Sequence, residues 1–421
     1  MSSGAIQIGV PESRRGAYRG AKRVLGITFA VTAVWFVWLL AARPSAVPWG
    51  FLLVSYLFLL GVTQFGVCFA AILRLSRAKW ARPYYRIAAV TTLAFFPLAI
   101  LLFLVIYKFG LQHVLYWAGS PPEGHVSPWL NEKFLFWRNL TVQLVFYAVA
   151  WRYFMIGLAP DVDEQTVADS KGWCRWVYRR ALRRKSTVGE DRLKSLVYLY
   201  SPVVLIACGI ANTIISWDFG MMLFPHYHST VFTLYFLVGN MFAGTALVLL
   251  LTVLTGRFVD LKPYFDTLQI KNLGILLTAF ALLWVYMFWA QFFVSWFGNL
   301  PSEYGILSKS MYGHYAPYFV TMMSCLIVIP ISALIFAPLK RMWWSMIVLA
   351  MVMCAGIWIN RYLIVMPALD AQHHPFSSVP EIALTIGLFA GFLWLLLVLI
   401  NAFPMVSRWE LEDALAEEPA Y

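Results

Sequence analysis

A short polar run between two apolar segments contains the residues best suited to chemistry. It extends from residue 216 to residue 230 and includes one carboxylate, Asp218, and two imidazoles, His226 and His228. An acid and two histidines at the end of a membrane-embedded helix cost free energy unless they are hydrated or paired, so such clusters are often functional. A carboxylate beside imidazoles favours the ionised acid and the protonated ring, which can exchange a proton near neutral pH. The run predicts a hydrated polar cluster that binds a ligand or passes protons.

A structural role explains the same residues. In that alternative, Asp218 caps the turn that follows its helix and His226 contacts a neighbouring subunit. Other polar residues are predicted at membrane depth, where hydrogen bonding between helices explains most of them and a water-lined path is the alternative for the rest. The candidates for a ligand site or proton path are Asp218, His226, His228, Asn212, Tyr286 and Gln291.

The composition indicates which elements must position these residues. Hydrophobic residues make up 61% of the 421 residues and charged residues 12%, whereas soluble domains are about 25% charged. Hydrocarbon about 30 Å thick needs roughly 20 apolar residues per helix. The sequence therefore predicts an all-α, polytopic membrane protein with ten transmembrane helices, over residues 24–42, 50–73, 87–107, 134–153, 195–217, 231–256, 273–297, 316–338, 343–366 and 382–403.

The basic residues predict how the helices are oriented. With the N-terminus in the cytoplasm, 26 of the 32 Lys and Arg residues fall in cytoplasmic segments and 6 on the other side. This bias follows the positive-inside rule and places both termini in the cytoplasm. The net charge of +12 thus reflects topology and gives no reason to expect nucleic-acid binding. The segment from Arg152 to Lys194 contains 10 of these charges and could hold anionic lipid head groups.

Cysteine and histidine placement argues against a redox centre in this chain. The five cysteines show no spacing typical of an iron–sulfur cluster, a zinc site or a covalent haem. All seven histidines are predicted in outer loops or at their edges, whereas a b-type haem in a helical bundle needs inward-facing histidines on the helices. We therefore expect no catalytic residue, no metal ion and no haem in the chain.

Some charged and small residues within the predicted helices indicate what those helices contact. Arg138 is expected to extend toward the membrane surface, and Arg361 to pair with Asp370 or a lipid phosphate. All 20 Asp and Glu residues fall in loops, tails or helix ends. A transporter, which usually needs an ionisable group at mid-depth, is therefore the least favoured function class. Gly387 and Gly391 form a G-x-x-x-G spacing that predicts a close helix contact, within the chain or with another subunit.

Five sequence blocks, in this order, resemble the NrfD/PsrC-like membrane proteins. The first runs from Asp218 to Thr230, and the others are residues 280–291, 296–303, 330–341 and 361–367. Within the family, the chain is most similar to the ActF subunits of alternative complex III, a bacterial quinol oxidoreductase. The motifs cover residues 190–370, and the ten-helix count extends the resemblance to the whole chain. Phe224 and His228 depart from the usual pattern, in which an acid often precedes the proline and an aromatic or small residue replaces the histidine.

The resemblance implies an architecture and a place in a complex. Helices 2–5 and 6–9 would form two four-helix bundles, with helices 1 and 10 outside them. The corresponding units are a cytoplasmic tail (1–23), the first helix and first bundle (24–218), the second bundle (219–366), and the last helix with a cytoplasmic tail (367–421). The chain would anchor a respiratory or photosynthetic quinol:electron acceptor oxidoreductase in the bacterial cytoplasmic membrane and contribute to a proton path.

The same resemblance implies the partners. They are a multihaem cytochrome c subunit with haem c, a subunit with iron–sulfur clusters, a paralogous ten-helix subunit that holds the principal quinol site, and lipids. Quinone is a candidate ligand of this chain. In the alternative of an independent quinone-binding subunit, Asp218 with His226 or His228 would accept protons at a quinol site of its own at the outer interface.

Overall fold

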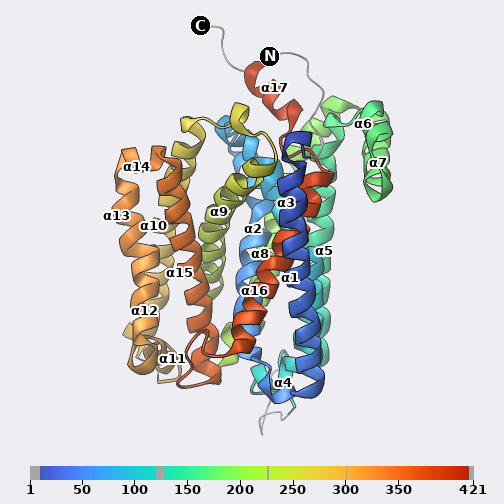
Figure 1. Cartoon of the computed structure of the whole chain (residues 1–421). Coiled ribbons are helices and arrows are strands. Elements are labelled where there is room, and N and C mark those ends of the chain that lie inside the picture. Colours follow the sequence, from blue (N-terminus) through green and yellow to red (C-terminus); the bar gives the residue numbers. More distant parts are fainter. Residues whose placement is uncertain (1–9, 120–127, 225–226, 300, 417–421) are drawn as a thin grey trace.

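The computed structural model describes residues 10–119, 128–224, 227–299 and 301–416, and this part of the chain is all-helical (Figure 1). Within these described residues, ten helical segments are long and apolar enough to cross a membrane, which confirms the predicted number of spans. Helix α1 (Arg15–Ala42) begins at the same end of the molecule at which α17 (Arg408–Ala416) lies. We call this the terminal end and the other the opposite end.

Nine further spans follow α1, and some of them contain breaks. They are built from α2 (Trp49–Leu75), α3 (Tyr85–Val105) with α4 (Leu111–Val114), α5 (Glu132–Leu158), α8 (Glu190–Phe219), α9 (Phe232–Phe258), α10 (Thr267–Gly298), α12 (Ala316–Met323) with α13 (Ile329–Ile335), α15 (Trp343–Leu369) and α16 (Val379–Ala402). One π-helical turn joins α3 to α4 and another joins α12 to α13. The shorter helices are α6 (Glu164–Asp169), α7 (Gly172–Val188), α11 (Pro301–Met311) and α14 (Ala337–Arg341).

Helix α2 is at the centre of the fold. It is apolar on all sides and nearly all of its residues are buried, as expected of a helix that others surround. It packs against α3, α8, α9, α15 and α16. Because α2 contacts helices of both predicted bundles, these contacts alone do not separate the two groups. The division into bundles and the domain boundaries therefore stay predictions.

The contact between α2 and α3 is unusually close. Thr92 Oγ1 of α3 donates to Thr63 O at 2.7 Å and accepts from Val67 N at 2.8 Å. Thr63 O and Val67 N are four residues apart and would otherwise form a hydrogen bond of the α-helix with each other. The Thr92 hydroxyl is therefore inserted between two backbone groups of α2. A Cβ atom on Gly66 would lie 2.3 Å from Ala88 O. Only glycine at this position allows the two backbones to approach in this way.

Helices α1 and α16 form a pair at the periphery of the molecule. Gly387 and Gly391 of α16 face α1: a Cβ atom on Gly387 would lie 2.4 Å from Thr32 Oγ1, and one on Gly391 would lie 2.6 Å from Phe29 Cδ2. The G-x-x-x-G spacing therefore serves a helix contact within the chain.

Buried charges attach the last helix to the terminal end. Glu410 Oε1 of α17 accepts from Arg74 Nε at 2.7 Å. Asp161 Oδ2 accepts from Arg86 Nη2 at 2.7 Å, and Asp161 Oδ1 accepts from Trp409 N at 3.0 Å. The start of the predicted C-terminal tail is thus packed into the protein.

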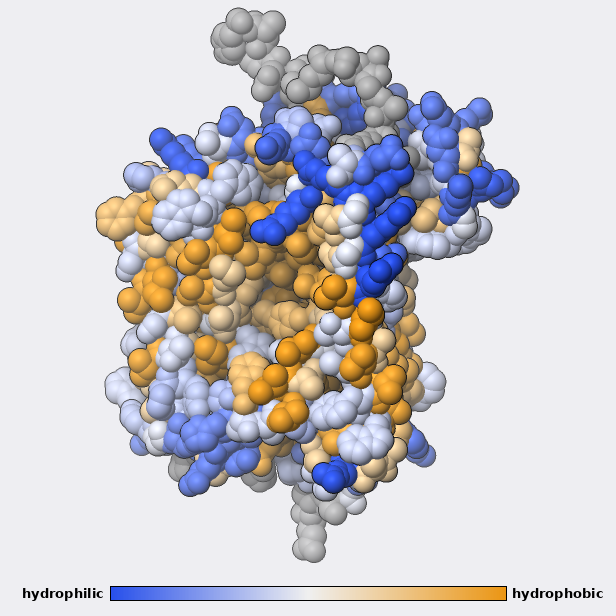
Figure 2. Space-filling view, in the orientation of Figure 1, coloured by the Kyte–Doolittle hydropathy of each residue, from blue (hydrophilic) through white to orange (hydrophobic). Residues whose placement is uncertain are grey.

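The surface has an apolar belt between two hydrophilic ends (Figure 2). The described histidines all lie at the opposite end: His113 in α4, His228 before α9, His314 after α11, and His373 and His374 after α15. His125 and His226 lie outside the described residues. The side of the membrane that each end faces stays a prediction from the basic residues.

Candidate functional site

Asp218 lies in the last turn of α8, where it is completely buried. Arg138 of α5 donates to both carboxylate oxygens, from Nε at 2.8 Å and from Nη2 at 2.6 Å. Trp129 Nε1 donates at 2.9 Å and Asn139 Nδ2 at 2.5 Å. The carboxylate therefore accepts four hydrogen bonds from protein groups, two of them from one planar guanidinium, which is the strongest arrangement for such a pair.

This pair corrects two expectations. Asp218 is enclosed by protein and is not part of a hydrated cluster, and Arg138 turns inward where it was expected to extend toward the membrane surface. The Arg138 guanidinium lies 4.1 Å from the centroid of the Trp129 ring, and its Nη1 donates to Trp129 O at 2.7 Å. Removing one partner of such a buried pair costs about 3–5 kcal/mol. The geometry thus suits an anchor between α5 and α8, and a role of Asp218 in a proton path stays a prediction.

Two other residues of the polar run contact α10. Ser229 Oγ donates to Gln291 Oε1 at 2.6 Å, and Gln291 Nε2 donates to Tyr227 OH at 2.8 Å. His228 is exposed, and no contact in the described part of the chain joins it to Asp218. His226 lies outside the described residues. The structure thus brings together Gln291 and part of the run, and it separates this group from the Asp218 pair.

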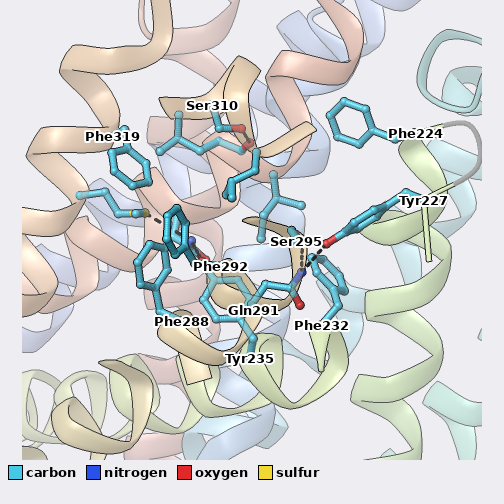
Figure 3. Close-up of a pocket in the computed structure, with 16 residues that line it drawn as sticks. Phe224, Tyr227, Phe232, Tyr235, Phe288, Gln291, Phe292, Ser295, Ser310 and Phe319 are labelled. Carbon is cyan, nitrogen blue, oxygen red and sulfur yellow. Dashed lines mark hydrogen bonds between the residues drawn. The ribbon is translucent and has the colours of Figure 1, made fainter. Parts of the chain in front are cut away.

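Gln291 lies in the wall of a cavity among α9, α10, α11, α12 and α15 (Figure 3). The cavity has about 690 Å³ of empty space, its open mouth included. Its walls are mainly aromatic and aliphatic, with a few polar groups that converge on the space. The polar lining residues are Tyr227, Tyr235, Gln291, Ser295, Ser310 and Asn360.

Asn212 belongs to a chain of buried amides in the middle of the protein. Its Nδ2 donates to Gln64 Oε1 of α2 at 3.2 Å, and its Oδ1 accepts from Asn240 Nδ2 of α9 at 2.7 Å. Arg361 Nη2 of α15 donates to Asn240 Oδ1 at 2.8 Å. The chain therefore connects four helices through side chains that are almost fully buried.

Arg361 extends this chain to the cavity. Its Nη1 donates to Asn360 Oδ1 at 2.9 Å, and Asn360 Nδ2 donates to Tyr235 OH. Asn360 and Tyr235 both line the cavity. The Arg361 guanidinium is completely buried and lies 3.7 Å from the centroid of the Phe236 ring. A positive charge is therefore fixed just behind the cavity wall, since arginine does not deprotonate in proteins.

The expected partners of Arg361 were wrong. Among the described residues it forms no ion pair, with Asp370 or any other acid, and its acceptors are two amide side chains and the backbone oxygen of Phe236. Complete burial also separates it from the bilayer, so no lipid phosphate reaches it. An arginine inside an apolar span was itself a signal of a functional site, but its neutral partners could not be read from their positions in the sequence.

Tyr286 is separate from the other candidates. It lies on α10 with 62% of its surface exposed, whereas Gln291 is 8% exposed. Five residues along an α-helix correspond to about 140° of rotation beyond one full turn. The two side chains therefore face different surroundings: Gln291 faces the cavity and Tyr286 the outside of the helical bundle.

A second polar group at the opposite end was not predicted. Glu381, at the start of α16, is 3% exposed and accepts from Ser378 Oγ at 2.6 Å. Its Oε1 lies 3.3 Å from His373 Nε2, and His373 Nδ1 lies 3.0 Å from Tyr362 OH. The loop between α15 and α16 brings these residues together. Within the described residues, no three His, Cys, Asp or Glu side chains are placed to share a metal ion.

Comparison with known proteins assigns the chain to a family. The family model described as polysulphide reductase, NrfD, matches residues 39–371. The chain belongs to the NrfD family. The NrfD match begins in the last turn of α1 and ends just after α15. It thus contains the Asp218–Arg138 pair, the amide chain and the whole cavity, and it leaves α16 and α17 outside. No curated protein matches the chain.

Proposed function

We propose that this chain is an ActF-like membrane subunit of a quinol:electron acceptor oxidoreductase of the alternative complex III type. The observation that carries the proposal is the NrfD match, which contains eight complete spans. Members of this family are typically membrane subunits of quinol or other redox complexes and generally pair with iron–sulfur and cytochrome subunits. The five sequence blocks supply the narrower resemblance to ActF.

In this proposal the chain anchors the complex and has no redox centre of its own. A multihaem cytochrome c, an iron–sulfur subunit and a paralogous ten-helix subunit hold the haems, the clusters and the principal quinol site. These partners would cover the opposite end, where the described histidines lie. The terminal end would face the cytoplasm of a bacterium, because 26 of the 32 basic residues belong to that side.

Gentle solubilisation tests the proposal. An affinity-tagged chain, extracted from its native membrane in a mild detergent, is expected to co-purify with subunits that show c-type haem bands in a reduced-minus-oxidised spectrum and iron–sulfur signals in electron paramagnetic resonance. The chain produced alone is expected to show neither. Purification from the native membrane as a single colourless polypeptide would contradict the redox-complex function. A b-type haem band in the isolated chain would contradict the cofactor-free role.

The cavity favours a second function, a quinone site in this chain. A quinone ring fits an aromatic wall, and its carbonyl oxygens need hydrogen-bond donors at fixed places. Gln291 and Tyr227 offer such polar groups (Figure 3). Asn360 in the same lining offers a third. The positive charge of Arg361 behind Asn360 would stabilise the negative charge that a quinone gains on reduction. The buried charge of Arg361 therefore favours a ligand that becomes negatively charged over an uncharged lipid tail.

Two substitutions on the same helix test this second function. Gln291→Leu removes the central polar group of the cavity, and Tyr286→Leu, on the exposed side of α10, is the matched control. If the cavity binds quinone, Gln291→Leu lowers the affinity of the purified complex for a short-chain quinone analogue on the order of tenfold, the effect of one lost hydrogen bond to a buried ligand. Tyr286→Leu leaves the affinity unchanged. Equal affinities for both variants and the parent protein would exclude the cavity as a quinone site.

A further inference from the structure

Three arginines gather where α5 and α8 leave the apolar belt at the terminal end. Arg152 belongs to α5, and Arg180 and Arg184 belong to α7, which folds back against the ends of both spans. In Figures 1 and 2, the segment with α6 and α7 forms a hydrophilic lobe that projects sideways beside these helix ends. The cluster therefore lies at the edge of the molecule, where a surrounding bilayer would have its head groups.

Helix α7 has the composition of an interfacial helix. Together with Lys171 just before it, the helix has seven basic residues up to Lys185, and this stretch contains no acid. Val177, Tyr178 and Ala181 face the protein, whereas Trp173 and Trp176 are 49% and 58% exposed. Basic residues combined with exposed tryptophans are typical of helices that lie in the head-group region of a membrane.

The three arginines are held close together and are not neutralised. The Arg152 guanidinium lies 5.0 Å from the centroid of the Tyr200 ring, and that of Arg180 lies 5.6 Å from the centroid of the Trp176 ring. Partial burial, followed by the positive charges of Arg152 and Arg180, lowers the pKa of the Arg184 guanidinium. In the described part of the chain, none of the three forms an ion pair.

The acid at the start of α8 is already paired with other cations. Glu190, at the start of α8, pairs with Lys185 at 3.2 Å and with Lys194 at 3.4 Å. Arg175 of α7 donates to the backbone oxygens of Ser170, in the loop before it, and of Ala168 in α6. The described carboxylates of this region thus pair with Lys185 and Lys194 and leave Arg152, Arg180 and Arg184 open to an external anion.

The surface next to the cluster suits the tails of the same ligand. On α8, apolar side chains at helical spacing are exposed along one face: Leu199 at 67%, Val203 at 43%, Ile206 at 63% and Ile210 at 52%. This face begins beside Tyr200, on which Arg152 rests, and continues toward the centre of the apolar belt. A molecule with an anionic head and long apolar tails would contact both features at once.

We propose that Arg152, Arg180 and Arg184 form a binding site for the phosphate head group of an anionic phospholipid in the leaflet at the terminal end. Guanidinium groups match phosphate oxygens in geometry and charge. The Tyr200 and Trp176 rings hold two of the arginines in place, and the acyl chains lie along the exposed face of α8. The site does not depend on the redox role proposed above.

Native mass spectrometry of the full-length chain in detergent tests this site. The probes are phosphatidylglycerol and, separately, phosphatidylcholine with the same acyl chains. The parent protein is expected to prefer phosphatidylglycerol, and the triple variant Arg152→Gln/Arg180→Gln/Arg184→Gln to lose that preference. At about 1 kcal/mol for each basic residue near an anionic lipid, the loss in affinity is on the order of a hundredfold. High salt should weaken the binding of phosphatidylglycerol to the parent protein, because it screens the charges.

A control variant separates this site from general electrostatic attraction. Arg15→Gln/Arg19→Gln/Arg23→Gln removes the same charge from exposed positions of α1 at the same end, and it is expected to change the affinity for phosphatidylglycerol by less than about twofold. Equal losses in the two triple variants, or equal binding of the two lipids by the parent protein, would overturn the proposal. The triple variant can also be purified as part of the complex from the native membrane. If that complex loses a protein subunit while the variant chain still binds the lipid, the arginines bind a protein and the proposal is overturned. Size-exclusion profiles identical to that of the parent protein exclude misfolding.

Discussion

Arg361 and Asn240 are joined by a hydrogen bond of 2.8 Å between Nη2 and Oδ1, and both side chains are buried inside the ring of spans. A buried guanidinium usually pairs with a carboxylate, because an uncompensated charge is costly in a low-dielectric interior. Here neutral amides, a backbone oxygen and the face of Phe236 take that place. The protein thereby holds a net positive charge at membrane depth beside its cavity, and this charge is the feature most easily tested by substitution.

Asn240→Asp is expected to be tolerated better than Asn240→Leu. Both substitutions remove the amide N–H that donates to Asn212 Oδ1, but the aspartate keeps the shape of the side chain and places a carboxylate against Arg361, which compensates the buried charge. The leucine keeps a similar volume but leaves the guanidinium with one acceptor fewer, at about 1–3 kcal/mol. The measurement is the thermal midpoint of the detergent-solubilised protein, followed by size-exclusion chromatography. A leucine variant as stable as the aspartate variant would show that the amide contact does not stabilise Arg361.

Asp218 and Arg138 are expected to depend on each other for stability. Each single substitution, Asp218→Asn or Arg138→Gln, leaves one buried charge unpaired and costs about 3–5 kcal/mol. The double substitution removes both charges and should cost clearly less than the sum of the two single ones, as a double-mutant cycle can show. Additive losses would contradict the direct pair.

The same double variant tests a chemical role of Asp218. If the carboxylate only anchors α5 to α8, a complex containing Asp218→Asn/Arg138→Gln assembles and oxidises quinol with unchanged proton stoichiometry. If Asp218 takes part in a proton path, the complex assembles but its quinol oxidation or proton release falls. Because the double substitution leaves no unpaired charge, a change in quinol oxidation or proton release can be assigned to the chemical role of Asp218 and not to a destabilised protein.

Gly387→Ala is expected to destabilise the protein, and Gly209→Ala is its matched control. A Cβ atom on Gly387 would lie 2.4 Å from Thr32 Oγ1 on α1, whereas one on Gly209 of α8 would meet no atom within 4 Å. Overpacking at the first position costs about 1–3 kcal/mol, and the second change raises helix propensity by roughly 0.5–1 kcal/mol. The thermal midpoints should therefore shift in opposite directions. A shift of the same sign for both would contradict the close packing of α1 and α16.

The orientation can be measured by cysteine labelling in sealed cells, in a variant without its five native cysteines. Cysteine at position 180 is expected to resist a membrane-impermeant maleimide applied from outside, because the positive-inside rule places this basic segment in the cytoplasm. Cysteine at position 374, an exposed position of the loop after α15, is expected to react in cells that produce this chain without partner subunits. Permeabilised cells, in which both positions should react, serve as the control. The reverse pattern in intact cells would invert the topology and the proposed placement of the partners.

The sequence determined the ten spans of this protein because each span depends on a local quantity, the length of an apolar run relative to the hydrocarbon thickness. It also placed Asp218 at a helix end, Gln291 and Asn212 among buried polar residues, and the described histidines at one end. These properties follow from residues that are close together in the chain. The match to the NrfD family confirms the broader assignment that the five sequence blocks suggested.

Only the tertiary structure decided which of these residues meet. Helices such as α2 and α9 are apolar on nearly every side, so the sequence has no marked polar face to show how each helix is rotated. Small rotations decide whether Arg138, 80 residues before Asp218, turns inward to pair with it or outward to the membrane. The same holds for Arg361 and Asn240, which are 121 residues apart. Their pairing depends on the simultaneous packing of several helices, because a buried polar group takes whatever partner the neighbouring helices bring within hydrogen-bonding distance.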